Sequence, residues 1–231
     1  NQKLKNFNFF IANPPYYISK CNQELWKHDP WGRNKYGVPP AGNADYAFFQ
    51  HIICSMDEKN GRCGILYPNG ILERDAEKSM REKIVEDDLI ECIVGLGKDL
   101  FYNSSMESCL VFCKTNKEKS KKGKILFIDA KAEITRKQTQ SFLESHHIKK
   151  IHDAYKGFED IKGFAKVVDL NEVRRNDFNL NLRLYVEEKR YVDNSLLETP
   201  LKTYIKEWKD SIKELEKSTK EMNEAIKEVL K

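Results

Sequence analysis

The feature that most constrains the fold of this chain is a regular alternation of short apolar runs with segments of helical periodicity. The runs have the length and composition of buried β-strands and occupy residues 7–12, 62–67, 89–96, 108–114 and 124–130. Residues 44–56 place apolar side chains at helical spacing, and residues 73–88 form a charged helical pattern. Strands that alternate with helices predict an α/β fold with a doubly wound, largely parallel sheet.

Length and charge narrow the class of protein. The 231 residues suffice for one α/β domain and an appendage. A net charge of +4 excludes a strongly basic nucleic-acid clamp. The basic segment 114–124 is interpreted as a solvated loop, with phosphate contact as the alternative. No apolar run approaches the roughly 20 residues that cross a bilayer, and the printed sequence has no signal-peptide pattern, so we expect no membrane contact.

The six cysteines give no sign of a metal centre. None forms a CxxC pair, and most lie inside apolar runs, where a reduced cysteine behaves as a small hydrophobic residue. A zinc site needs clustered ligands, and His51 with Cys54 supplies too few of them. The pattern predicts a reduced, cytoplasmic protein without structural metal.

Residues 17–43 differ from the rest of the chain. They are rich in Pro, Gly and Asn, contain Trp26, Trp31 and Tyr36, and show no periodicity. Loops of this length within a compact domain are usually functional or disordered. The aromatic side chains argue against a purely disordered segment, but they do not reveal its role.

The end of the first predicted strand carries a distinctive turn, Asn13, Pro14, Pro15 and Tyr16. Proline cannot donate a hydrogen bond to a sheet ladder, so the strand must stop there. The carboxyl ends of strands in open α/β sheets are the places where ligands bind. The simpler alternative is a strand-ending turn whose aromatic residues cap the core.

This turn has a chemical rationale as a site for an amino group. The side-chain oxygen of Asn13 and the backbone carbonyl of Pro14 can each accept one hydrogen from the exocyclic amino group of a nucleobase. The nitrogen then takes a more tetrahedral, nucleophilic geometry, and the diproline keeps the carbonyl fixed. Tyr16 can stack on a base that has left the duplex. No strong general base is needed, because a methylated, positively charged nitrogen loses its proton readily.

Beyond this turn, the chain resembles the second half of the catalytic domain of an amino-group DNA adenine methyltransferase. More closely, it resembles the modification subunit of type I restriction-modification systems. The resemblance extends over roughly residues 7–195 and is carried, in order, by the blocks at 42–56, 61–96, 99–114, 125–130 and 176–186. It implies a Rossmann-like methyltransferase sheet and methyl transfer from S-adenosylmethionine to adenine at a specific DNA site.

The resemblance also implies roles for single residues. Asn13 and Pro14 receive the target amino group, and Asn13 also borders the cofactor. Tyr16 stacks on the flipped adenine, and Pro15 belongs to the substrate-binding turn. Phe101, in "LFYNSSMESCLVF", is expected to place a second ring against the base. The alternative for Phe101 is a core position at the entrance of a strand.

The cofactor turn of the family is missing from this chain. In the family, the glycine-rich turn for S-adenosylmethionine lies upstream of the strand that ends in Asn13. Gly95 and Gly97 form a GxG pattern, but no helix pattern follows it, so it fails as a dinucleotide fingerprint. We therefore expect a fragment that is inactive alone. Asp45 is interpreted as a charge at a helix start, and Tyr17 as a residue packed beneath the loop.

The last segment predicts one long helix with a narrow apolar stripe. Pro200 stands where a helix can begin. The stripe alternates steps of three and four, as a heptad seam does, through Leu201, Ile205, Trp208, Ile212, Leu215, Thr219, Met222, Ile226 and Val229. We divide the chain into a methyltransferase portion, 1–195, and a helical tail, 196–231. By the resemblance, the tail docks a specificity subunit and a restriction subunit joins the full complex; packing on its own domain is the alternative.

Two other functions remain open. The chain could be a non-catalytic module that docks a specificity subunit, or an amino-group methyltransferase that acts on RNA or protein. The block at 42–56 and the terminal heptads favour the type I system. The recognised DNA sequence cannot be read from this chain, because a separate subunit reads the DNA in such systems.

Overall fold

The computed structural model describes residues 3–16, 18–101, 105–138, 140–186 and 201–229. The chain divides into two compact units, Asn1–Glu188 and Lys189–Lys231. The boundary predicted at residue 195 and the interpretation of Tyr17 fall outside the described residues. Within the described ranges, no helix has the length and apolar character to span a membrane.

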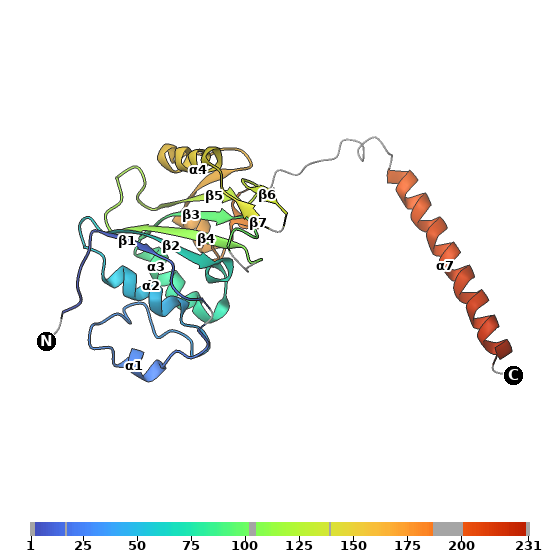
Figure 1. Ribbon diagram of the computed structural model, residues 1–231, viewed down its shortest axis with the longest axis horizontal. Helices are drawn as coiled ribbons and strands as arrows, with labels where there is room; N and C mark the ends of the chain where they lie inside the picture. The colour runs from blue at the N-terminus through green and yellow to red at the C-terminus, as the bar shows by residue number, and fades with distance from the viewer. Residues whose placement is uncertain (1–2, 17, 102–104, 139, 187–200, 230–231) are drawn as a thin grey trace. The chain divides into compact units, whose positions relative to one another are not determined.

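A six-stranded mixed sheet forms the centre of the first unit (Figure 1). The strands are β1 (Phe9–Ala12), β2 (Arg62–Pro68), β3 (Ile90–Leu96), β4 (Ser108–Lys114), β5 (Lys124–Ala130) and β8 (Ala165–Asp169). Their spatial order is β1-β2-β4-β3-β5-β8. Strands β1, β2, β3 and β5 run in one direction, and β4 and β8 run against them. The predicted α/β class is confirmed, with each predicted strand present.

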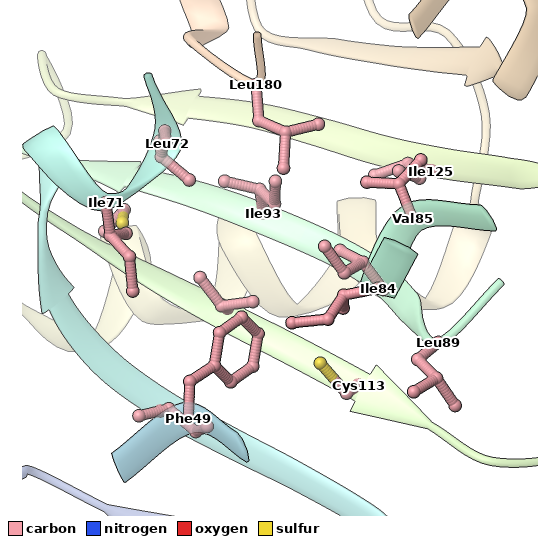
Figure 2. Packing of buried hydrophobic residues seen from close by; sticks show 14 of the residues in the cluster. Phe49, Ile71, Leu72, Ile84, Val85, Leu89, Ile93, Cys113, Ile125 and Leu180 are labelled. Atoms are coloured by element: carbon pink, nitrogen blue, oxygen red, sulfur yellow. The ribbon is translucent and has the colours of Figure 1, made fainter. Parts of the chain in front are cut away.

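Helices cover both faces of the sheet (Figure 1). The helices are α2 (Asp45–Cys54), α3 (Lys78–Glu86), α4 (Ser145–Gly157) and α5 (Leu170–Arg175), with 3-10 turns at Asn69–Leu72, Asp75–Glu77 and Leu182–Leu184. Helices α2 and α3 bury Phe49 and Ile84 against one face, in the cluster drawn in Figure 2. On the other face, Ala154 of α4 packs with Val94 and Ile128. Alternate residues of the central strands therefore point into two separate cores, one on each face of the sheet.

Strand β1 differs from the prediction of a buried strand. It stands at the end of the strand order, and its side chains alternate between exposed and half-buried. Phe10 and Ala12 pack on the core beside α2, whereas Phe9 and Ile11 are 56% and 82% exposed. The prediction was wrong because a continuous apolar run does not show whether a strand is central or outermost.

Within the aromatic segment, residues 18–43 are described, and they fold against α2 through contacts with Gln50 and Cys54. It contains the short helix α1 (Gln23–Lys27). Arg33 pairs with Asp29 and lies over the rings of Trp26 and Trp31, at 5.1 and 4.7 Å from their centroids. Aromatic stacking and a charge-assisted hydrogen bond thus order a segment that has no periodicity.

The basic segment 114–124 joins β4 to β5. It therefore lies at the edge of the sheet where β5 begins, opposite the edge where β1 ends in Asn13. Its Lys117 is not a free cation, because its buried ammonium donates to Asp88 at 2.6 Å and to the carbonyl of Lys124 at 2.9 Å. The position shows that this segment is not part of the Asn13 edge; phosphate contact by its other lysines stays an untested alternative.

The six cysteines have free thiols, in agreement with the reduced state expected from the sequence. Cys63, Cys92, Cys109 and Cys113 are buried, and Cys21 and Cys54 are half-buried. Burial raises the pKa of Cys92 and Cys109, because a charged thiolate is poorly solvated in an apolar interior. These cysteines are core residues rather than reactive groups.

The second unit contains the helix α7 (Leu201–Val229), as predicted. Within this unit, the stripe residues Ile205, Trp208, Leu215 and Met222 are 43%, 64%, 68% and 58% exposed. Thr219 donates its hydroxyl hydrogen to the carbonyl of Leu215 at 2.8 Å. The polar member of the stripe thus satisfies its own hydrogen bond, so it needs no polar partner across a helix interface.

Candidate active site

The candidate site lies where β1 ends. Because β1, β2, β3 and β5 run in one direction, their carboxyl ends meet at one edge of the sheet, as the arrowheads in Figure 1 show. Asn13 follows β1 directly, and its side chain is exposed at this edge. Pro14 is buried and Pro15 is exposed. The turn therefore anchors itself through Pro14 and leaves the Asn13 side chain accessible.

The side chain of Tyr16 contacts that of Asn13. Its hydroxyl donates a hydrogen bond of 2.5 Å to Oδ1 of Asn13. The ring packs against buried residues of both cores. Burial, followed by the charges of Cys109 and Asp45, raises the pKa of Tyr16 to about 12. The phenol is therefore neutral at physiological pH and acts as a donor toward Asn13.

Phe101 follows β3 at the same edge. Its ring is half-buried and packs, like that of Tyr16, against the cluster that includes Leu66 and Leu96. The structure thus places the rings of Tyr16 and Phe101 against the same cluster, and Tyr16 also contacts Asn13. This arrangement is compatible with both sequence-based alternatives for Phe101, because a half-buried ring can contribute to the core and still present an edge to a ligand.

A buried ion-pair network supports the site from the α2 side. Asp45, the first residue of α2, is 1% exposed, and its Oδ2 accepts from Nη2 of Arg74 at 2.6 Å. The same guanidinium donates to buried Glu77 at 2.7 Å. Tyr67 donates to the backbone carbonyl of Asp45 at 3.3 Å. The network ties the start of α2 to the turn after β2, so Asp45 is more than the terminal charge predicted from sequence.

A second cluster of polar side chains lies at the edge of the sheet where β2, β3 and β5 end. Glu107, just before β4, accepts from Nδ2 of Asn69 at 3.1 Å and pairs with Lys131 at 3.3 Å and Lys98 at 3.9 Å. These four residues flank four different strands of the sheet. Sequence reasoning missed them, along with Arg74 and Glu77. The four residues around Glu107 could have been found from their position, because each lies within two residues of a predicted strand at this edge.

The GxG pattern of Gly95 and Gly97 is filled by the protein's own side chains and backbone. At Gly95 an added Cβ would lie 3.1 Å from Leu182, and at Gly97 it would lie 2.6 Å from the carbonyl of Lys131. Both glycines therefore permit close packing rather than the approach of a ligand. Across the part of the chain that the structure describes, no group of three or more His, Cys, Asp or Glu side chains could hold a metal ion.

Comparison with known proteins identifies the family. A model described as N-6 DNA Methylase matches residues 1–194. The chain belongs to the N-6 DNA methylase family. The resemblance stated from the sequence blocks is thereby confirmed, and the sheet with a candidate Asn13 site is that of a family member.

Relatives within the N-6 DNA methylase family are subunits of type I enzymes. The chain is 38% identical over 216 residues to the MjaVII methylase subunit of Methanocaldococcus jannaschii, covering 88% of this chain and 36% of that protein. It is 32% identical over 204 residues to the HindI methylase subunit of Haemophilus influenzae, covering 83% and 44%. The match thus spans less than half the length of each of these relatives.

A solved structure agrees with the sequence comparison. The type I restriction-modification methyltransferase subunit from Streptococcus thermophilus superposes with a TM-score of 0.74 at 32% identity. The match covers 79% of this chain and 39% of that one. The fold of the first unit is therefore that of a type I methyltransferase subunit.

Proposed function

We propose that this chain forms the target-base half of a DNA adenine methyltransferase that works in a type I restriction-modification system. The observation that carries the proposal is the exposed side chain of Asn13, at the carboxyl end of β1 and hydrogen-bonded to Tyr16, in a member of the N-6 DNA methylase family. Methyltransferases of this class act where an amino nitrogen is held by fixed acceptors. The site offers such acceptors in Asn13 and Pro14.

In the proposed mechanism, Asn13 Oδ1 and the Pro14 carbonyl each accept one hydrogen of the adenine amino group. This geometry directs the nitrogen lone pair away from the ring and toward the methyl group. S-adenosylmethionine, when bound, supplies that methyl group in electrophilic form. Buried Pro14 fixes its carbonyl, so the acceptor need not reorganise during the reaction. The methylated nitrogen then releases a proton to water.

Tyr16 and Phe101 hold the base in this proposal. A target base must leave the duplex, and its unpaired faces are stabilised by aromatic stacking. Tyr16 stacks after its hydroxyl releases Asn13, because the amino group needs the same oxygen. Both rings are anchored in the core on one side, which limits the conformational freedom lost when a base binds.

The helix α7 is proposed to dock the specificity subunit. Ile205, Trp208, Leu215 and Met222 of its apolar stripe are largely exposed within their own unit, and a helix of this pattern buries its stripe against partner helices. The restriction subunit joins the same complex in this proposal. The unpaired, largely buried thiols suit the reducing cytoplasm, where such a complex would act.

The test is methyl transfer by Asn13→Ala in the full-length subunit assembled with a specificity subunit. Incorporation of labelled methyl groups into DNA should fall by orders of magnitude while DNA affinity is retained, because the lost contact forms mainly as the nucleophile is activated. Asn116→Ala, an exposed amide at the opposite edge, is the matched control and should be silent. Near-normal turnover by Asn13→Ala would exclude the proposed mechanism.

A further inference from the structure

Two segments of the first unit carry exposed basic side chains, and they lie at opposite edges of the sheet. Segment 114–124 presents Lys119 and Lys122 where β5 begins. The hairpin of β6 (Thr135–Lys137) and β7 (Gln140–Phe142) follows the carboxyl end of β5. Figure 1 shows this hairpin beyond the arrowheads of β3 and β5. It therefore belongs to the edge that holds Asn13.

The cations of the hairpin are weakly held by the protein. Arg136 and Lys137 have side chains that are 65% and 68% exposed, and the nearest carboxylates are Asp99 at 3.4 Å and Glu144 at 4.0 Å. Exposed pairs at such distances compete poorly with an incoming anion. Neighbouring residues of a strand point to opposite faces, so the two cations flank the hairpin and can reach phosphates on both of its sides.

The hairpin is fixed to the segment that carries Phe101. The backbone N–H of Ser141, which is 1% exposed, donates to the carbonyl of Asp99 at 2.9 Å. Close contact of Gly97 with the carbonyl of Lys131 joins the same two segments. A phosphate bound by the hairpin is therefore held at a defined position relative to the aromatic ring of Phe101.

We propose that the β6–β7 hairpin binds the sugar–phosphate backbone of the DNA duplex beside the base that enters the Asn13 site. Arg136 and Lys137 each neutralise one phosphate. This inference rests on the proposed function, since a base extruded toward Asn13 brings its flanking backbone to the same edge. Two adjacent, weakly paired cations match the charge of a polyanion such as the DNA backbone.

The experiment compares two double variants of the assembled enzyme. Arg136→Ser with Lys137→Ser removes the hairpin cations, and Lys119→Ser with Lys122→Ser removes equal charge at the opposite edge. Anisotropy of a fluorescein-labelled random-sequence duplex is followed over a series of salt concentrations. Each lost phosphate contact lowers the slope of log affinity against log salt by about 0.9, so the hairpin variant should lose about 1.8 and the control almost nothing.

Either of two results would overturn the inference: an unchanged slope in the hairpin variant, or an equal loss of slope in both variants. An unchanged slope together with impaired co-purification of the specificity subunit would assign the hairpin to a protein interface instead. The variant Asn13→Ala separates this inference from the proposed function. It should keep the wild-type slope and lose methyl transfer, whereas retained methyl transfer refutes the mechanism without affecting the slope measured for the hairpin.

Discussion

Tyr16 donates its phenolic hydrogen to Oδ1 of Asn13 at 2.5 Å. The oxygen that the proposed mechanism assigns to the adenine amino group is therefore already engaged. A base entering the site exchanges one hydrogen bond for another, and such an exchange has a small net free energy, about 0.5–1.5 kcal/mol. The hydroxyl thus keeps Asn13 oriented before the base arrives.

The first prediction concerns Tyr16→Phe. The ring remains available for stacking, and Asn13 no longer has to release a partner before the amino group binds. Turnover should stay within a fewfold of wild type, with KM for DNA unchanged or lower. Steady-state methylation of a DNA duplex by the assembled enzyme measures both constants. A loss of turnover by orders of magnitude would show that the hydroxyl takes part in the chemistry.

The second prediction is that Tyr16→Ala, unlike Tyr16→Phe, impairs methylation and raises KM for DNA in the same steady-state assay. Loss of the ring removes base stacking, which contributes about 1–3 kcal/mol for each base–aromatic contact. The same change at Phe101 tests whether that ring also touches the base. If Phe101→Ala lowers stability without changing KM, Phe101 belongs to the core alone.

The third prediction concerns Arg74. Its guanidinium lies between the carboxylates of Asp45 and Glu77, whose side chains are each 1% exposed. Arg74→Ala would leave both carboxylates buried without their cation, and breaking a buried pair in this way costs about 3–5 kcal/mol. Arg74 is itself a quarter exposed, so we expect the lower end of that range. Urea unfolding measures the loss.

Arg174→Ala is the matched control for this prediction. Arg174 forms a bidentate pair with Glu86 on the exposed surface. Surface pairs of this kind contribute little, so the urea midpoint should scarcely move. A similar loss in both variants would contradict a special role for the buried network.

The fourth prediction concerns alkaline pH. Burial, as the largest cause, raises the pKa of six tyrosines of the first unit: Tyr16, Tyr36, Tyr46, Tyr67, Tyr155 and Tyr185. An unfolded tyrosine has a pKa of about 10, so above that pH the unfolded chain loses protons that the folded chain retains. The stabilisation is complete below pH 10 and is lost as the pH rises through the folded pKa values. Melting temperatures should therefore fall steeply above about pH 10.

Tyr67→Phe tests the cause of this alkaline loss. Tyr67 is fully buried, and its pKa lies well above 10. Removing its ionisable group should make the decline in melting temperature above pH 10 shallower than in wild type. An equally steep decline would mean that other groups, such as the buried thiols, control alkaline unfolding.

The strands, and the position of the candidate site at the end of β1, could be predicted from the sequence. The side-chain contacts around that site could not. The run 108–114 matches β4 residue for residue, because uninterrupted apolar residues with flanking polar ones define a central strand. Asn13 was identified by type and position alone. The Asp45–Arg74 pair joins residues 29 positions apart, and such a contact depends on how α2 and the turn after β2 meet in three dimensions.

The elements between residues 131 and 186 were not assigned from sequence for a related reason. Hairpin strands β6 and β7 have three residues each, too few to show a period of two. The outermost position of β1 was equally hidden, since it depends on which strands lie next to it. Apolar patterning reports burial of a central strand well and reports position within a sheet poorly.

The fifth prediction concerns the cofactor. The isolated 231-residue chain should neither bind S-adenosylmethionine appreciably nor methylate DNA, because Gly95 and Gly97 are occupied by close packing and offer no cofactor turn. Isothermal titration of the chain with the cofactor should give no heat above dilution. Micromolar binding by the isolated chain would show that the described residues already hold a cofactor site.

The final prediction concerns α7. Ile212→Glu with Met222→Glu places two charges in the apolar stripe, where an interface with partner helices would have to desolvate them. The double variant should fail to co-purify with the specificity subunit, while the thermal melt of the first unit stays unchanged. Thr203→Glu with Ser211→Glu puts the same charge outside the stripe and should assemble normally. Unchanged assembly by the stripe variant would exclude docking through this face, and a collapsed melt would instead assign the stripe to the core of its own domain.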